Sequence, residues 1–149
     1  QSQPNYSSEW GLHPPVNKSI YMALQDKYRS VLNLGEALNT QDGDVKEENG
    51  QLKISGTVET QAQKDKLWDE IKRVGGENPS DLVADIKVAN TAYYDKYTVK
   101  GGDSLSKIAK SYYGDPMKYK DIFAANTDKL DNPDVIHPGQ ELIIPFPGA

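Results

Sequence analysis

Hydrophobic residues in the first half of the chain switch between the spacing of helices and the spacing of strands. Between residues 17 and 35 they recur every three or four positions, as on the buried face of one helix. These positions are Ile20, Leu24, Tyr28, Val31 and Leu32. The turn-forming residues Thr40-Gln41-Asp42-Gly43 come next, and we expect them to end this helix.

The dipeptide Asn49-Gly50 predicts a tight β-hairpin. It separates residues 44–48 from residues 51–58, both predicted as strands, and it tolerates the two positive φ angles of a type I′ turn. A two-residue loop sets the register, so Val45 is expected opposite Ile54 on one face of the sheet.

A second helix and a third strand complete this part of the chain. Thr60 and Gln63 have the spacing of a capping box, and Gly75-Gly76 predicts the end of the helix. The hydrophobic face between them consists of Leu67, Trp68, Ile71 and Val74. Every second residue from 82 to 88 is apolar, which is typical of a half-buried strand.

The last third of the chain predicts a strand, two helices and a final strand. Tyr97-Thr98-Val99 has strand character, and the turn Gly101-Gly102 follows it. Either Asp103 or Ser104 can cap the next helix, and we expect Asp103 to act mainly as that cap. The buried face of this helix is predicted at Leu105, Ile108, Ala109 and Tyr112.

A second short helix is expected to begin at Asp115-Pro116, where proline loses no helical hydrogen bond. Pro138-Gly139 fits the two central positions of a type II turn and leads into the closing strand at 142–144. Tyr112 and Tyr119 occupy predicted core positions of the two helices. Three other tyrosines are open to either a packing role or stacking on a sugar ring: Tyr93, Tyr94 and Tyr113.

These elements predict an α+β protein with two small domains. Residues 1–15 contain Pro4, Pro14 and Pro15 among polar residues and are expected to form an extended N-terminal arm. Residues 16–90 form an αββαβ domain, and residues 91–149 form a βααβ domain after a short linker. The contact between two domains of this size is expected to be small.

Charge and length exclude several classes of protein. The 149 residues carry a net charge of −5, so no basic excess favours binding to nucleic acid. No run approaches the ~20 apolar residues of a membrane-spanning helix. Cysteine is absent, which excludes disulfides, thiolate catalysis and cysteine-ligated metals. A first residue of Gln1 fits a removed signal peptide and a trimmed chain equally.

The ionisable residues form no recognisable catalytic or metal-binding pattern. His13 and His137 are far apart in the sequence and lack the partners of a zinc motif. The acidic clusters at 42–44, 47–48 and 131–134 do not have the spacing of an EF-hand loop. We find no pairing of a nucleophile with a base, so the protein is predicted not to be an enzyme, and metal ligands remain unknown.

The second domain resembles a LysM domain over its whole length. The resemblance is carried by Tyr97-Thr98-Val99-Lys100, Gly102-Asp103-Ser104-Leu105, Ile108-Ala109, Ala125-Asn126, Ile136, Pro138-Gly139-Gln140, Leu142 and Ile144-Pro145. Residues 113–118 and 128–134 make both middle segments longer than in the shortest members of that family.

The first domain resembles the BON family. Its strand Ile54-Ser55-Gly56-Thr57-Val58 is similar to the characteristic strand of that family, whereas residues 75–81 depart from the usual short link. A BON domain followed by LysM is found in small bacterial proteins, including a potassium-binding family. The resemblance therefore implies either a glycan-binding protein of the periplasm or cell envelope, or a potassium-binding sensor or scaffold in the cytoplasm.

The LysM resemblance also implies a binding site for peptidoglycan or other N-acetylglucosamine oligomers. In this family the sugar chain lies in a shallow groove between the first strand-to-helix loop and the loop before the last strand. The matching residues are Gly102, Asp103, Ser104, Leu105, Asn126, Leu130, Asn132, Pro133, Asp134 and Ile136. Asn126 is also a candidate for a loop brace. No cofactor is expected except a possible potassium ion, and the BON-like domain is a candidate for binding a protein partner.

Overall fold

The computed structural model describes residues 24–147, which form two compact units that divide between residues 89 and 90. The predicted N-terminal arm, His13 and the first hydrophobic position of the predicted helix, Ile20, lie outside the described residues.

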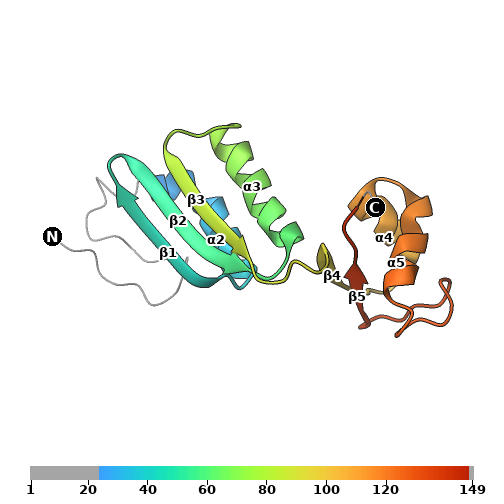
Figure 1. Ribbon diagram of the computed structural model, residues 1–149. Coiled ribbons are helices and arrows are strands. Elements are labelled where there is room, and N and C mark those ends of the chain that lie inside the picture. Colours follow the sequence, from blue (N-terminus) through green and yellow to red (C-terminus); the bar gives the residue numbers. More distant parts are fainter. Residues whose placement is uncertain (1–23, 148–149) are drawn as a thin grey trace. The chain divides into compact units, whose positions relative to one another are not determined.

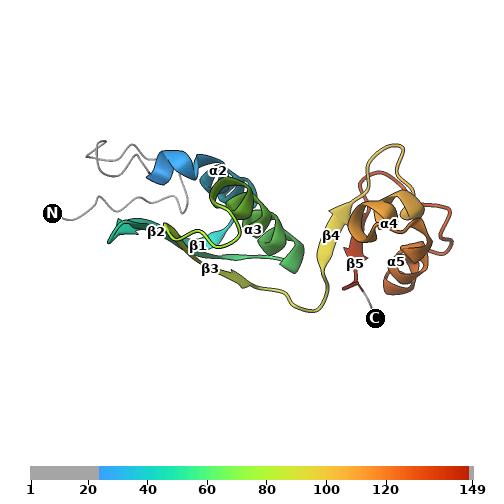
Figure 2. The ribbon, with the colours of Figure 1, turned by 90° about the horizontal axis from the view of Figure 1, so that it is seen from above.

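The first unit is a sheet with helices α2 and α3 on one of its faces (Figures 1 and 2). Its elements are α2 (Arg29–Ala37), β1 (Gln41–Glu48), β2 (Gln51–Val58), α3 (Gln61–Gly75) and β3 (Leu82–Val88). Within the described residues the strand order is β1-β2-β3, with β1 antiparallel and β3 parallel to β2. The fully buried centre of the core consists of Tyr28, Val31, Leu32, Leu52, Val58, Leu67 and Ile71.

The hairpin has the predicted register. Asn49 and Gly50 adopt φ angles of 55° and 77°, and Val45 lies opposite Ile54. The prediction for the preceding turn was wrong, because β1 already begins at Gln41. The irregular residues Asp42 and Gly43 lie in a β-bulge, which lets the strand continue through them.

Gly56 explains why the bulge fits there. A Cβ atom at Gly56 would overlap the Thr40 side chain and would lie 3.5 Å from the Cα atom of Gly43. Thr40 is buried, and its hydroxyl donates a hydrogen bond of 2.7 Å to the carbonyl oxygen of Gly35. Only glycine lets β2 approach the bulged start of β1 this closely.

Helix α3 begins and ends as the sequence predicts. Thr60 and Gln63 form the capping box, with the Gln63 N–H donating to Thr60 Oγ1 at 3.3 Å. The helix ends at Gly75, and Gly76 follows with a φ angle of 88°. Glycine tolerates that positive φ angle at little cost, so the chain can leave the helix there.

The end of α3 also approaches the N-terminal part of the unit. A Cβ atom at Gly75 would overlap the hydroxyl of Tyr28, which is completely buried. That hydroxyl donates to Asp81 Oδ1 at 2.6 Å, and Lys27 Nζ pairs with Asp81 Oδ2 at 2.5 Å. Burial and the Asp81 carboxylate raise the pKa of Tyr28 far above its usual value, so the phenol remains a hydrogen-bond donor.

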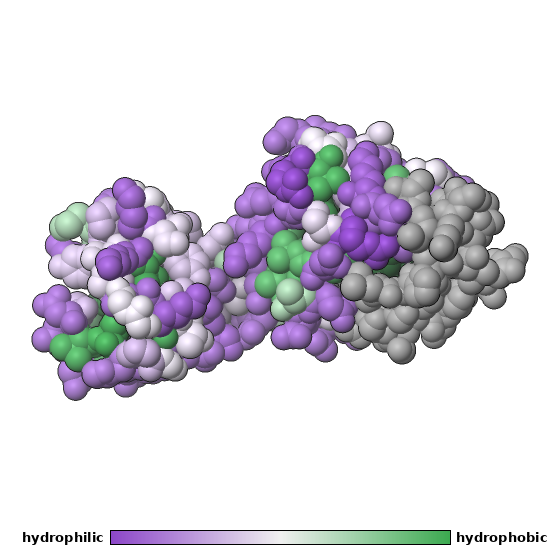
Figure 3. All heavy atoms as spheres, turned by 180° about the vertical axis from the view of Figure 1, so that it is seen from behind, coloured by the Kyte–Doolittle hydropathy of each residue, from purple (hydrophilic) through white to green (hydrophobic). Residues whose placement is uncertain are grey.

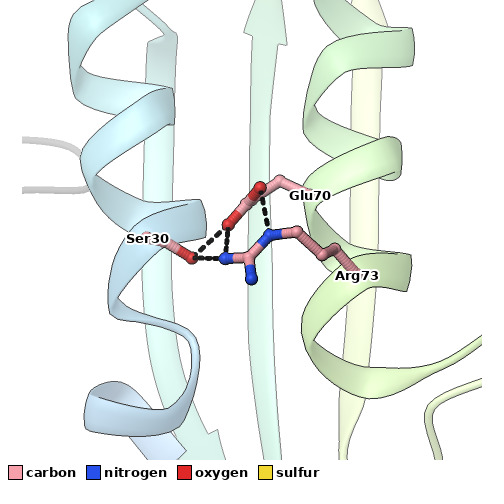
Figure 4. Close-up of polar contacts among 3 residues, drawn as sticks. All are labelled: Ser30, Glu70 and Arg73. Atoms are coloured by element: carbon pink, nitrogen blue, oxygen red, sulfur yellow. Dashed lines mark hydrogen bonds and ion pairs between the residues drawn. The ribbon is translucent and has the colours of Figure 1, made fainter.

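A polar cluster joins α2 to α3 (Figure 4). The Glu70 carboxylate accepts hydrogen bonds from the Ser30 hydroxyl and from the guanidinium of Arg73, whose Nε atom lies 3.0 Å from Glu70 Oε1. The hydrogen bond from Arg73, followed by the one from Ser30, lowers the pKa of Glu70 to about 2. Glu70 is therefore charged at any physiological pH.

The second unit is smaller, and its described residues, 90–147, contain two α-helices and a two-stranded antiparallel sheet (Figure 1). Its elements are β4 (Asp95–Thr98), α4 (Leu105–Tyr113), a 3₁₀ turn at Pro116–Lys118, α5 (Tyr119–Ala125) and β5 (Glu141–Ile144). Tyr97 lies opposite Leu142 in the sheet. Its buried core consists of Val99, Leu105, Ile108, Ala109, Ile122, Leu130, Leu142 and Ile144.

The surface seen from behind is mostly hydrophilic, and hydrophobic residues reach it only in small separate areas (Figure 3). In residues 24–147, no helix combines the length and the apolar character that crossing a membrane requires.

Candidate functional site

The loop between β4 and α4 is a braced turn with an open glycine. Gly102 has a φ angle of 87°, and no atom would lie within 4 Å of a Cβ atom built there. The Asp103 carboxylate holds the turn because Oδ2 accepts hydrogen bonds from the Tyr97 hydroxyl at 2.7 Å and from the Lys100 N–H at 2.8 Å. The loop therefore exposes backbone at Gly102 without depending on a ligand for its shape.

Asp103 is not the cap of α4, which corrects the sequence-based expectation. The N-cap is Ser104, whose Oγ accepts a hydrogen bond of 3.2 Å from the Lys107 N–H. Asp103, the residue before this N-cap, uses its carboxylate to hold the β4–α4 turn instead. The hydrogen bond from Tyr97, followed by the one from Lys100, holds the pKa of Asp103 below its usual range.

Asn126, at the C-terminal end of α5, is completely buried. Its Nδ2 atom donates to the carbonyl oxygens of Ile122 at 2.7 Å and of Ile143 at 2.8 Å. Its Oδ1 atom accepts from the Ile143 N–H at 2.8 Å. The side chain therefore joins α5 to β5, which is the loop-brace role, and it is not accessible to a glycan.

Two further residues of the expected site belong to the core. Leu105 is 2% exposed and Leu130 is 3% exposed, so neither offers a surface to a ligand. Their packing has a positioning role instead. The same hydrophobic core is contacted by Leu105, which follows the β4–α4 loop (the first loop), and by Leu130 and the partly buried Ile136, which lie in the loop between α5 and β5 (the second loop).

The remaining part of the second loop lies at the surface. Asn132 and Asp134 are exposed, and Pro133 and Ile136 are partly exposed. Asn132 Oδ1 accepts a hydrogen bond of 2.8 Å from the Asp134 N–H, and the Asn132 carbonyl accepts from the Val135 N–H at 3.1 Å. This local turn presents Pro133 between two polar side chains.

Three tyrosines that the sequence left open have structural partners. The Tyr113 hydroxyl donates to the Pro145 carbonyl at 2.6 Å, and burial raises the pKa of Tyr113 to about 12. The ring of Tyr94 packs against that of Phe146 with 5.8 Å between centroids. The Tyr93 hydroxyl accepts a hydrogen bond of 3.0 Å from Asn90 Nδ2. Hydrogen bonds or ring contacts within the protein account for all three.

A hollow of about 180 Å³ adjoins the first loop and was missed by sequence reasoning. It is lined by Tyr97, Asp103, Lys107, Ile108, Ser111 and Tyr112. The four-residue spacing of Lys107 and Ser111 places both on one side of α4, which is the only sequence signal for this site. Tyr97 reaches the hollow from β4, and no residue spacing within a single helix or strand could have shown that β4 and α4 come together there.

Comparisons with known proteins support part of this interpretation. Residues 97–145 match the LysM domain family, so the second unit contains a LysM domain. A protein of Escherichia coli O6:H1 named potassium binding protein Kbp is 37% identical over 98 residues, which cover 65% of this chain and 64% of that protein. This alignment is longer than the second unit and therefore includes residues of the first.

A second relative shares only one segment with the chain. An uncharacterized protein of Deinococcus radiodurans is 63% identical over 49 residues, or 33% of this chain and 19% of that protein. The chain thus spans less than two thirds of the length of both relatives.

Proposed function

We propose that this chain is a non-catalytic binding protein of the bacterial cell envelope whose LysM domain binds N-acetylglucosamine-containing glycan such as peptidoglycan. The observation that carries the proposal is the LysM match over residues 97–145. On this proposal the protein works in the periplasm or at the cell wall, and seven of the ten expected site residues remain as candidate contacts. They are Gly102, Asp103, Ser104, Asn132, Pro133, Asp134 and Ile136.

The chemistry of the two loops suits an N-acetyl group. Such a group offers one amide donor, one carbonyl acceptor and one methyl. Gly102 has no side chain to block the backbone, and the space above it is open. Pro133 and the partly exposed Ile136 supply a small apolar surface for the methyl. A shallow surface of this kind binds weakly, and high avidity then requires several domains.

The test is an NMR titration of the full chain with N-acetylglucosamine oligomers at millimolar concentration. We expect amide shifts in residues 102–105 and 131–136. Gly102→Trp fills the open space and is expected to abolish these shifts. Gly114→Trp is the matched control, because Gly114 also has a positive φ angle, of 76°, and open space around its Cβ position at the other end of α4.

The proposal fails if the wild-type chain shows no shifts in either loop. It also fails if Gly114→Trp loses binding as completely as Gly102→Trp, because backbone strain rather than blockage would then explain the loss. Retained amide dispersion in both variants shows that the second unit is still folded.

A second candidate function is potassium binding, which the relative named potassium binding protein Kbp favours. On this alternative the chain is a cytoplasmic sensor or scaffold. Within residues 24–147 no group of three or more His, Cys, Asp or Glu side chains could hold a metal ion. The oxygens around potassium would then come mainly from backbone carbonyls.

Potassium binding has its own readout. A ligand that binds only the folded state raises the melting temperature. Potassium chloride should therefore raise the melting temperature of the chain relative to sodium chloride at equal ionic strength. Identical melting curves in the two salts would eliminate this alternative and would leave the glycan proposal untouched.

The first unit is proposed to be a BON-like domain with a protein partner. Its order of helix, strand, strand, helix and strand supports the resemblance. The alignment with the Escherichia coli relative also extends into this unit.

A further inference from the structure

The hollow between β4 and α4 has a different chemistry from the two loops. Apart from Asp103, none of its lining residues belongs to the expected glycan site. It carries a carboxylate at Asp103, an ammonium at Lys107 and a hydroxyl at Ser111. Beneath them lie the buried side chain of Ile108 and the ring of Tyr112.

The two charges of the hollow are not paired with each other. Among the described residues, neither Asp103 nor Lys107 takes part in an ion pair within 4.0 Å. Lys107 Nζ donates to the carbonyl oxygen of Gly102 at 3.2 Å, so two of its three N–H groups remain to donate to a ligand. Both hydrogen bonds to Asp103 go to Oδ2, so Oδ1 remains available as an acceptor.

The walls of the hollow are held in place before any ligand binds. Tyr112 donates to Asp95 Oδ2 at 2.5 Å, and its ring packs edge-to-face against Tyr97 with 6.1 Å between centroids. Tyr97 is in turn anchored on Asp103. A preformed site loses little conformational entropy on binding.

We propose that this hollow binds an amino-acid group that carries its ammonium and its carboxylate on the same carbon. The ammonium pairs with Asp103, the carboxylate with Lys107 and Ser111, and the aliphatic part lies against Ile108 and Tyr112. A neutral sugar ring can form hydrogen bonds with these side chains but carries no charge to pair with either of them. The charge pair therefore favours a zwitterion over a sugar.

This inference rests on the proposed glycan function for the source of the ligand. Peptidoglycan strands carry short peptides, and diaminopimelate in such a peptide ends in a free ammonium and carboxylate on one carbon. Lysine at the same position ends in an ammonium alone. Because Asp103 borders both the Gly102 loop and the hollow, one ligand can occupy both sites.

The experiment is an NMR titration of the full chain with four probes. They are an N-acetylglucosamine oligomer, a disaccharide–tetrapeptide with diaminopimelate, the same compound with lysine, and free diaminopimelate. We expect amide shifts at Lys107 and Ser111 with both diaminopimelate probes and not with the oligomer. Loss of the terminal carboxylate in the lysine probe should weaken binding about two- to fivefold, as for a partly exposed ion pair.

Two variants assign the effect to the hollow. Lys107→Gln should weaken binding of the diaminopimelate compound and should remove the two- to fivefold preference for it over the lysine compound. Lys110→Gln is the matched control, since Lys110 is an exposed lysine of α4 that does not line the hollow.

The inference is overturned if the diaminopimelate probes leave Lys107 and Ser111 unmoved, if the lysine compound binds equally well, or if Lys110→Gln has the same effect as Lys107→Gln. Shifts at Lys107 and Ser111 with the plain oligomer would make the hollow a sugar site and would also overturn the inference. Failure of the glycan function is a separate result, because it appears as unmoved amides at 102–105 and 131–136 with the oligomer. A response to free diaminopimelate but not to the disaccharide compound would show a site for free amino acids and would refute the peptidoglycan source.

Discussion

Replacing Asn126 with alanine should strongly destabilise the LysM unit, although the sequence also placed this residue among glycan contacts. The side chain makes three hydrogen bonds of 2.7–2.8 Å with the backbone of Ile122 and Ile143 while fully buried. It binds both the N–H and the carbonyl of Ile143, so it acts as a substitute for a neighbouring strand along β5. Alanine leaves these three backbone groups without partners.

The magnitude follows from the number of bonds. A hydrogen bond contributes about 1 kcal/mol net, and a partner left buried without one costs about 1–3 kcal/mol. Three lost bonds therefore predict a destabilisation of at least about 3 kcal/mol. A unit the size of residues 90–149 has a total stability of about 3–9 kcal/mol. At 4–8 °C for each kcal/mol, the melting temperature of this unit should fall by about 12 °C or more.

The measurement is thermal unfolding followed by amide signals of each unit, so that the first unit serves as an internal reference. Asn132→Ala is the matched control. It removes one hydrogen bond, to the Asp134 N–H in an exposed turn, and should change the stability by less than about 1 kcal/mol. The reasoning is refuted if Asn126→Ala melts within a few degrees of wild type, and above all if that folded variant has lost glycan binding.

Two further predictions concern the first unit. Gly75→Ala should destabilise the first unit by about 2 kcal/mol in urea unfolding, because the added methyl group overlaps the buried Tyr28 hydroxyl. Adding Tyr28→Phe to the same chain should recover part of this loss. A loss of stability that is unchanged by Tyr28→Phe would contradict the overlap. The pKa of Glu70 is lowered from 4.5 to about 2, so its charged form stabilises the fold above about pH 4.5 and that stabilisation is lost as the pH falls towards 2. Glu70→Gln should therefore flatten this part of the acid-unfolding curve measured by circular dichroism, and superimposable curves would show that the contact with Arg73 has no effect on stability.

Local features were predictable because each depends on a few neighbouring residues. The turn at Asn49-Gly50 follows from the positive φ angles that these two residues tolerate, and it sets the hairpin register. The type II turn has the expected hydrogen bond of 3.1 Å from the Gln140 N–H to the His137 carbonyl, with Gly139 at a φ angle of 92°. In both cases the partners lie within three residues of each other.

The bulge before the hairpin needed tertiary information. Residues such as Asp42 and Gly43 favour turns, so in most local contexts they end a helix or a strand. Here β2 provides a strand partner on one side, and Gly56 provides the space that the bulged backbone needs. Pairing with a segment 13 residues further along the chain therefore overrode the local preference.

What the sequence determined by itself is the set of elements and the LysM resemblance of the second unit, which the family match confirms. What only the tertiary structure decided is the role of each polar residue around that site. Asn126 turned from a candidate ligand into a brace because α5 and β5 meet around it, and Asp103 turned from a helix cap into a turn brace because Tyr97 reaches it. Caps and turns are decided by hydrogen bonds between neighbours in the sequence. Burial and pairing are decided by which distant segments pack together, and a periodic pattern shows that a face is buried without showing what covers it.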